Sequence, residues 1–322
     1  MIVNKQRKIS IKLFLLLFLI FPIIKPEELA VATILGNAVA SFVTKLLWAW
    51  NLISYVVTFL LFVNSLKNGK KIKTYTWLMF ALSISLLFST LKIGNCSFKE
   101  IYQLLGNYLM IAVLASIYSE QKYLSFLQAW YYCITFWMAI NSFTIYLYFH
   151  KGMYYVDKNT NYYLFGLDNV SFLISLTGFF IGFVYNKIRF KKIKFSYTLF
   201  YAFIGSSYFY CKAGTGMAIT ALCMLILIFY KTNLFKCLNY SKTLFVLIVS
   251  FLMIVVLQNV KWAAGLLDLI GKDLTYNGRL DIWTAAMRVL PNNFLFGYGI
   301  TTEVVKNALS NGGIAWISGI AH

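Results

Sequence analysis

The polar residues that could do chemistry gather in the last part of the chain, residues 261–322. Two of the four arginines, Arg279 and Arg288, lie close together there, and His322 is the final residue. The same segment holds four of the ten acidic residues: Asp268, Asp273, Asp281 and Glu303. Guanidinium groups bind phosphate oxygens as fixed charges, and an imidazole exchanges a proton near neutral pH. The sequence therefore predicts that function lies in this segment.

A short helix is predicted inside this segment, over residues 279–290. Asn277 can cap its start, and Pro291 stops it. Arg279 and Trp283 are four residues apart, so they share one face of the helix. A guanidinium and an aromatic ring would therefore be presented side by side.

Two glycines, Gly297 and Gly299, flank Tyr298 a little further on. Such a pair permits a tight backbone turn close to a ligand or to a membrane surface. Each of these features also has a purely structural interpretation, because an interfacial arginine often reaches lipid phosphate and an interfacial tryptophan is often an anchor. Their order and spacing together are more informative than any one of them.

The composition of the chain is unusually apolar, and it indicates which elements must position these residues. The chain is 60% hydrophobic and 12% charged, with a mean hydropathy of +0.72. Its apolar blocks are apolar all round, unlike the helices of a soluble core. We therefore predict an all-α polytopic membrane protein. The net charge of +19 does not indicate nucleic-acid binding, because the lysines sit in short clusters between apolar blocks.

The apolar blocks predict about nine transmembrane helices. They lie near residues 11–24, 46–66, 76–93, 104–118, 123–149, 169–186, 197–211, 215–230 and 243–260. The basic start of the chain before the first block resembles a signal peptide, but no small-residue cleavage pattern follows, so we expect an uncleaved first span. Residues 29–44 contain Gly36 and Asn37 and are interpreted as interfacial or re-entrant.

The distribution of basic residues predicts the orientation. With the amino terminus in the cytoplasm, the inner segments hold more than twice as many Lys and Arg residues as the short outer segments, as the positive-inside rule requires. We therefore predict two parts: a transmembrane bundle, residues 1–260, and a long loop with short helices, residues 261–322. Because the number of spans before it is odd, the loop is expected on the outer face. No nucleotide-binding motif is present, so a substrate there would arrive already activated, most simply on a lipid.

The order of motifs in this loop resembles that of a known family. The residues that carry the resemblance are Gly278-Arg279, Trp283, Pro291-Asn292, Phe296-Gly297-Tyr298-Gly299 and Ala321-His322. Together they resemble the signature loop of the O-antigen ligase and Wzy-type polysaccharide polymerase superfamily of membrane glycosyltransferases. Looser matches are Phe165-Gly166 with Asp168-Asn169, and the turn from Lys212 to Gly216.

The resemblance implies a reaction and a role for each residue. A sugar hydroxyl would attack the anomeric carbon of an undecaprenyl-pyrophosphate-linked oligosaccharide, with pyrophosphate as the leaving group. Arg279, helped by Lys212 and Arg288, would bind the pyrophosphate, and His322 would be the base. Trp283, Gly297 and Gly299 would contact the substrate. Asp281 and Glu303 are fallback bases, and neither a metal nor another cofactor is implied.

Alternatives to a polymerase of capsule or O-antigen repeat units remain open at this stage. The same residues would serve a ligase that moves a finished glycan to another acceptor, and a flippase or transporter of such lipids is a third candidate. The expected partners are the lipid-linked oligosaccharide, membrane lipids and other capsule-assembly proteins (a flippase or a chain-length regulator), with no nucleic acid. Relatives in this superfamily continue past the histidine, so we expect the loop to be truncated at its carboxyl end. The predicted location is the bacterial cytoplasmic membrane.

Overall fold

The computed structural model describes residues 12–93, 98–118, 123–154, 161–211 and 214–231. These residues are mostly helical, as the composition predicted. The chain divides into two compact units, one of residues 1–76 and 110–231 and the other of residues 77–109 and 232–322. The predicted boundary at residue 260 lies outside the described residues.

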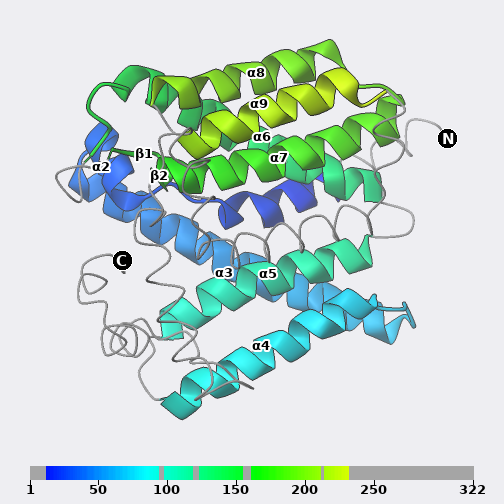
Figure 1. Ribbon diagram of the computed structural model, residues 1–322. Coiled ribbons are helices and arrows are strands. Elements are labelled where there is room, and N and C mark those ends of the chain that lie inside the picture. Colours follow the sequence, from blue (N-terminus) through cyan, green and yellow to red (C-terminus); the bar gives the residue numbers. More distant parts are fainter. Residues whose placement is uncertain (1–11, 94–97, 119–122, 155–160, 212–213, 232–322) are drawn as a thin grey trace, which may run out of the picture. The chain divides into compact units, whose positions relative to one another are not determined.

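The first unit contains most of the described helices (Figure 1). Residues 12–20 form a helix that continues into a 3-10 turn, η1. The bounds are η1 Phe21–Ile23, α2 Glu28–Leu35, α3 Asn37–Lys67, α6 Tyr123–Tyr148, β1 Tyr162–Tyr163, β2 Gly166–Leu167, α7 Asp168–Phe190, α8 Phe195–Tyr210 and α9 Gly214–Phe229. In the second unit lie most of α4, Thr74–Ile93, and the first half of α5, Phe98–Ile117.

Three described helices are long and apolar enough to cross a membrane. They are Asn37–Lys67, Thr74–Lys92 and Ser171–Phe190. Shorter apolar helices are Lys12–Ile23, Leu105–Ile117 and Ile219–Phe229. A membrane-spanning helix needs about 20 apolar residues, so the three long helices meet this requirement by themselves. The chain therefore has the helices of a membrane protein.

The polarity of α3 is inverted relative to that of a helix in a soluble protein. Its buried positions include Asn51, Ser54 and Thr58, each less than 5% exposed. Its exposed positions include Phe59 and Leu60, each 60% exposed. In water this arrangement would leave apolar surface exposed and bury polar groups. A hydrocarbon surround removes that conflict, so α3 has the surface expected of a helix in lipid.

The segment 29–44 differs from its predicted form. It is two helices separated at Gly36, which has φ +84° and ends α2, and α3 begins directly at Asn37 rather than near residue 46. Glycine adopts this backbone conformation without the steric cost of a Cβ. The 31 residues of α3 give a helix of about 46 Å, longer than the roughly 30 Å of a bilayer core. The sequence indicated an interrupted segment of sixteen residues, 29–44, whereas the helix is interrupted at Gly36 alone.

Helices α6 to α9 pack closely because small residues sit at their contacts (Figure 1). A Cβ on Gly182 of α7 would lie 2.5 Å from Tyr197 Cε2 and 2.6 Å from Tyr131 Cε2. Gly205 of α8 faces Thr220 of α9 so closely that a Cβ would overlap Thr220 Cγ2. Close helix approach at small residues is the usual way that helices associate in lipid.

A cavity of about 20 Å³ lies among α7, α8 and α9. Gly205 and Thr220 line it together with Tyr201 and Cys223. Its size suits a single water molecule. Cys223 is buried.

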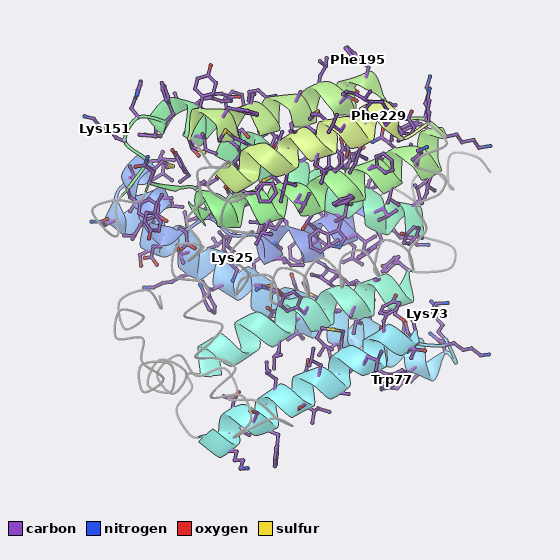
Figure 2. The ribbon with its side chains drawn as sticks, viewed as in Figure 1. Lys25, Lys73, Trp77, Lys151, Phe195 and Phe229 are labelled. Carbon is purple, nitrogen blue, oxygen red and sulfur yellow. The ribbon has the colours of Figure 1, made fainter. Side chains whose placement is uncertain are left out.

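Most of the described basic residues of the first unit lie at one end of its bundle, here called the basic end; the exceptions are Lys25, Lys45 and Lys151. The residues of the basic end are Lys12, Lys67, Lys70, Lys71, Lys73, Lys187, Arg189, Lys191, Lys192, Lys194 and Lys231. Several lie over aromatic rings, with Lys187 Nζ 4.2 Å from the ring centre of Tyr230. The opposite end, here called the hairpin end, holds Lys151, and Figure 2 shows Lys73 and Lys151 at these two ends.

Candidate functional site

The residues predicted to carry the chemistry lie outside the described residues. This holds for Arg279, Trp283, Arg288, Gly297, Gly299 and His322, for the fallback bases Asp281 and Glu303, and for Lys212. Their arrangement therefore stays a prediction. Parts of the looser matches do fall within the described structure. They are Phe165-Gly166, Asp168-Asn169 at the start of α7 and the glycines Gly214 and Gly216 at the start of α9. Described side-chain contacts surround Phe165-Gly166, and the candidate site is built there.

Phe165 and Gly166 belong to a small hairpin at the hairpin end of the bundle. Strands β1 and β2 are antiparallel, with Tyr163 opposite Gly166. Tyr163, Leu164 and Phe165 are each less than 5% exposed. The ring of Phe165 meets Trp137 of α6 edge to face at 6.0 Å. The hairpin is therefore anchored in the aromatic core of the bundle rather than projecting from it.

Two further segments of the chain are fastened to this hairpin by backbone hydrogen bonds. The Glu27 N–H donates to the Leu164 carbonyl at 2.8 Å, and the Met153 N–H donates to the Tyr162 carbonyl at 2.8 Å. Tyr154 also pairs with Tyr162 in an isolated bridge. Residues near 27, 154 and 166, far apart in the sequence, are thus held together.

Two polar side chains, those of Glu27 and Tyr154, lie near Gly166 where these three segments meet. Gly166 has φ +83°, and a Cβ built on it would lie 3.8 Å from Glu27 Oε1 and 4.0 Å from Tyr154 Oη. The nearest atom to that Cβ would be Glu27 Cγ, at 3.7 Å, so a methyl group would be in ordinary van der Waals contact there. Glycine is favoured at this position by its backbone conformation. The Glu27 side chain is exposed, Tyr154 is half-buried and Gly166 is buried.

The environment of Tyr154 keeps its hydroxyl protonated. Burial raises the pKa of Tyr154 above its ordinary value, and the negative charge of Glu27 and the neighbouring Tyr162 raise it further. The two tyrosine rings lie 5.2 Å apart at 32°. A hydroxyl that can donate a hydrogen bond therefore lies near a carboxylate that can accept one.

Basic side chains lie at the same end of the bundle. Lys25 Nζ is 4.3 Å from the centre of the Trp48 ring, and Lys151 is exposed; Figure 2 labels both lysines. Tyr210, in the last turn of α8, meets Phe149 with ring centres 5.4 Å apart. Helix α8 therefore ends at the hairpin end as well. Among the described residues, no cluster of His, Cys, Asp and Glu suits a metal ion.

The sequence indicated only part of this site. Phe165-Gly166 was singled out by the family resemblance, but Glu27 and Tyr154 were not. The available signal for Glu27 was an acid directly after Pro26 at the end of an apolar block. Comparisons of the chain with protein-family models, curated proteins and solved structures give no match.

Proposed function

We propose that this chain is a membrane glycosyltransferase of the polysaccharide-polymerase type. It joins undecaprenyl-pyrophosphate-linked oligosaccharide repeat units on the outer face of the bacterial cytoplasmic membrane, for a capsule or another surface polysaccharide. The single observation that carries the proposal is the ordered set of loop motifs from Gly278-Arg279 to Ala321-His322.

The proposed topology has about nine spans with a cytoplasmic amino terminus. Support comes from the basic end of the first unit, because positively charged residues favour the cytoplasmic side. The hairpin end is then on the outer face. Residues 261–322 follow an odd number of spans and are proposed to lie on that face too.

The proposed chemistry is a glycosyl transfer. A sugar hydroxyl oxygen forms a bond to the anomeric carbon, and the bond from that carbon to the pyrophosphate oxygen breaks, leaving the electron pair on pyrophosphate. Arg279 binds the phosphate oxygens with a charge that cannot be lost, and Lys212 and Arg288 supplement it. His322 accepts the hydroxyl proton. Trp283, Gly297 and Gly299 contact the glycan.

A described feature favours a transferase over an ion-coupled transporter of the same lipid. Ionisable residues inside membrane spans mark the pathways of pumps and transporters. Among the residues whose side chains the structure describes, no Asp, Glu, Lys, Arg or His is buried. The buried polar residues there are neutral, such as Asn51, Asn141 and Asn186. A ligase acting on a different acceptor uses the same chemistry and is the second candidate.

The test is a set of substitutions at the chromosomal locus of the source bacterium. Arg279→Ala is expected to abolish the ladder of long polysaccharide chains on a gel, while single lipid-linked repeat units still accumulate. Arg279→Lys is expected to restore little, because an ammonium cannot replace the paired contacts of a guanidinium. Arg189→Ala, in an exposed basic cluster of α7, is the matched control and should leave the ladder unchanged.

The outcomes separate the candidates. A normal ladder in Arg279→Ala cells contradicts any transferase mechanism that uses this residue. Loss of attachment to the acceptor with chain length intact would favour the ligase. Loss of chain length itself supports the polymerase.

A further inference from the structure

We propose that the last turn of α7 and the end of α9 bind the phosphate of an anionic phospholipid. The residues are Lys187 on α7, and Tyr230 and Lys231, which directly follow α9; together they are here called the phosphate site. The ligand is a lipid of the surrounding membrane, and no step of the glycosyl transfer is assigned to it, so the inference does not depend on the proposed function. Only its placement in the cytoplasmic leaflet follows from the proposed topology.

Two ammonium groups from the ends of two helices meet at one aromatic ring. Lys187 Nζ lies 4.2 Å from the centre of the Tyr230 ring, and Lys231 Nζ lies 5.8 Å from the same centre. Phe183, one turn before Lys187 on α7, meets Tyr230 edge to face with ring centres 5.9 Å apart, so the ring is held against α7. Cations within about 6 Å of a ring centre are attracted to the ring. Tyr230 therefore keeps two positive charges close together.

The described acidic residues of the first unit lie far from these two charges. They are Glu27, Glu28 and Asp168. Asp168 begins α7, about 28 Å along the helix from Lys187, and Glu27 is hydrogen-bonded to the hairpin at the other end of the bundle. An ammonium carries three N–H donors, and the ring occupies only one side of it. The donors on the other sides suit the oxygens of a phosphate.

The neighbouring basic residues differ from this pair in what holds them. Arg189 donates from Nη1 to Oε1 of Gln128 on α6 at 3.4 Å, so its guanidinium is engaged with another helix. Lys192 is exposed in the turn after α7, and its side chain makes no hydrogen bond, ion pair or ring contact with the described residues. A ligand would have to order that long side chain first, at a cost in entropy. Lys187 and Lys231 are ordered by the ring beforehand, so they lose less when a ligand binds.

Exposed apolar side chains beside the phosphate site favour a lipid over a soluble anion. Ile188 of α7 is 48% exposed, and Ile228 and Phe229 of α9 are 66% and 44% exposed; Figure 2 labels Phe229 at this end of the bundle. Further along the two helices, Val184 and Leu225 are exposed as well. Acyl chains can pack on such surface, whereas a soluble phosphate compound cannot cover it. Charge at the helix ends and apolar surface beside it match the two parts of a phospholipid.

The experiment measures the binding of single lipid molecules to the purified full chain. The chain is prepared in a neutral detergent, phosphatidylglycerol is titrated in, and native mass spectrometry gives the dissociation constant of the first bound lipid. Two comparison probes are phosphatidylcholine, which has a phosphate but no net charge, and glycerophosphoglycerol, which has the same headgroup without acyl chains. Phosphatidylglycerol is expected to bind about fivefold more tightly than either, or better, because only it offers both net charge and apolar surface.

Charge-matched variants separate a site from diffuse attraction. Lys187→Gln and Lys231→Gln are each expected to weaken phosphatidylglycerol binding about fivefold, the contribution of one basic residue near an anionic lipid. Tyr230→Leu keeps the charge and removes the ring, so it should weaken binding about twofold to fivefold. Lys192→Gln and Arg189→Ala remove the same charge elsewhere in the cluster and should change binding by less than about twofold. Thermal unfolding of every variant reports whether the fold is retained.

Each outcome decides the inference. Equal weakening in all four variants that remove a charge would overturn it, because that is the result of diffuse attraction to positive charge. Unchanged binding in Lys187→Gln would overturn it too, as would equal binding of phosphatidylglycerol and phosphatidylcholine. If glycerophosphoglycerol binds as tightly as the lipid, the ligand is a soluble anion and the lipid assignment fails. Should Tyr230→Leu not fold, the two lysine variants measured against their two controls decide the result alone.

Discussion

Gly205 at the contact of α8 and α9 offers a sharp test of helix packing. In Gly205→Ala the new methyl group would overlap Thr220 Cγ2 and lie 3.3 Å from Thr220 Cβ and 3.4 Å from Thr220 Oγ1. Carbon atoms in contact prefer about 3.5–4.0 Å, so the two helices must separate or Thr220 must move. Overpacking of this kind typically costs about 1–3 kcal/mol.

The adjacent cavity decides where in this range the cost falls. It measures about 20 Å³ and is lined by both Gly205 and Thr220, so it gives the displaced methyl group some room. We therefore expect a loss of about 1–2 kcal/mol in the free energy of unfolding. Thr220→Ser removes Cγ2, the overlapping atom, and keeps the hydroxyl. The double variant Gly205→Ala with Thr220→Ser should regain most of what the glycine substitution alone loses.

The assay is thermal unfolding of the four proteins of this cycle in one detergent or nanodisc preparation. A loss of 1 kcal/mol lowers Tm by about 2–4 °C in a domain of comparable size. Ala202→Leu, at an exposed position of α8, adds more volume without a facing helix and is the matched control. An unchanged Tm in Gly205→Ala, or no recovery in the double variant, would refute the packing argument.

Two further predictions concern the ends of the bundle. The first uses a chain whose native cysteines are replaced and a thiol reagent that does not cross membranes. Added to intact cells, the reagent should label Lys151→Cys, whereas Lys71→Cys should be labelled only after the cells are permeabilised. The reverse pattern would invert the proposed topology. The second prediction concerns pH. The pKa of Tyr154 is raised in the folded chain above its ordinary value of 10.0. Above pH 10 the unfolded chain therefore releases the tyrosine proton before the folded chain does, and the folded chain loses stability as the pH rises further. Tm should therefore fall less between about pH 9 and pH 11 in Tyr154→Phe than in the unchanged chain, and equal falls would show that this tyrosine does not contribute.

The sequence predicted the helices better than it predicted their interruptions. Block 197–211 corresponds to α8, Phe195–Tyr210, because a run of apolar residues is a property of neighbours in sequence. The break at Gly36 was assigned to a whole segment, since hydropathy averages over a window and does not indicate a single backbone angle. The buried face of α3 was not predicted either, although Asn51, Ser54 and Thr58 recur at the spacing of one helix face.

The candidate site was predictable only where residues close in sequence carry it. The loop motifs around Arg279 are local, so a pattern could find them, and the same holds for Phe165-Gly166. Glu27 and Tyr154 meet only because β1 and β2 fasten two distant segments to one hairpin. No spacing rule in one sequence connects these two residues.

The inverted polarity of α3 has a consequence for how the chain enters the membrane. At the centre of a helix that is being inserted, each Leu, Ile, Phe or Val favours the membrane by about 0.3–0.6 kcal/mol. The exposed face of α3 is rich in these residues, and the buried stripe of Asn51, Ser54 and Thr58 is small and neutral. The helix can therefore enter the bilayer before its neighbours are made. The three polar residues would then face lipid until another helix covers them. They therefore favour the association of α3 with another helix after insertion, and they contribute nothing to insertion itself.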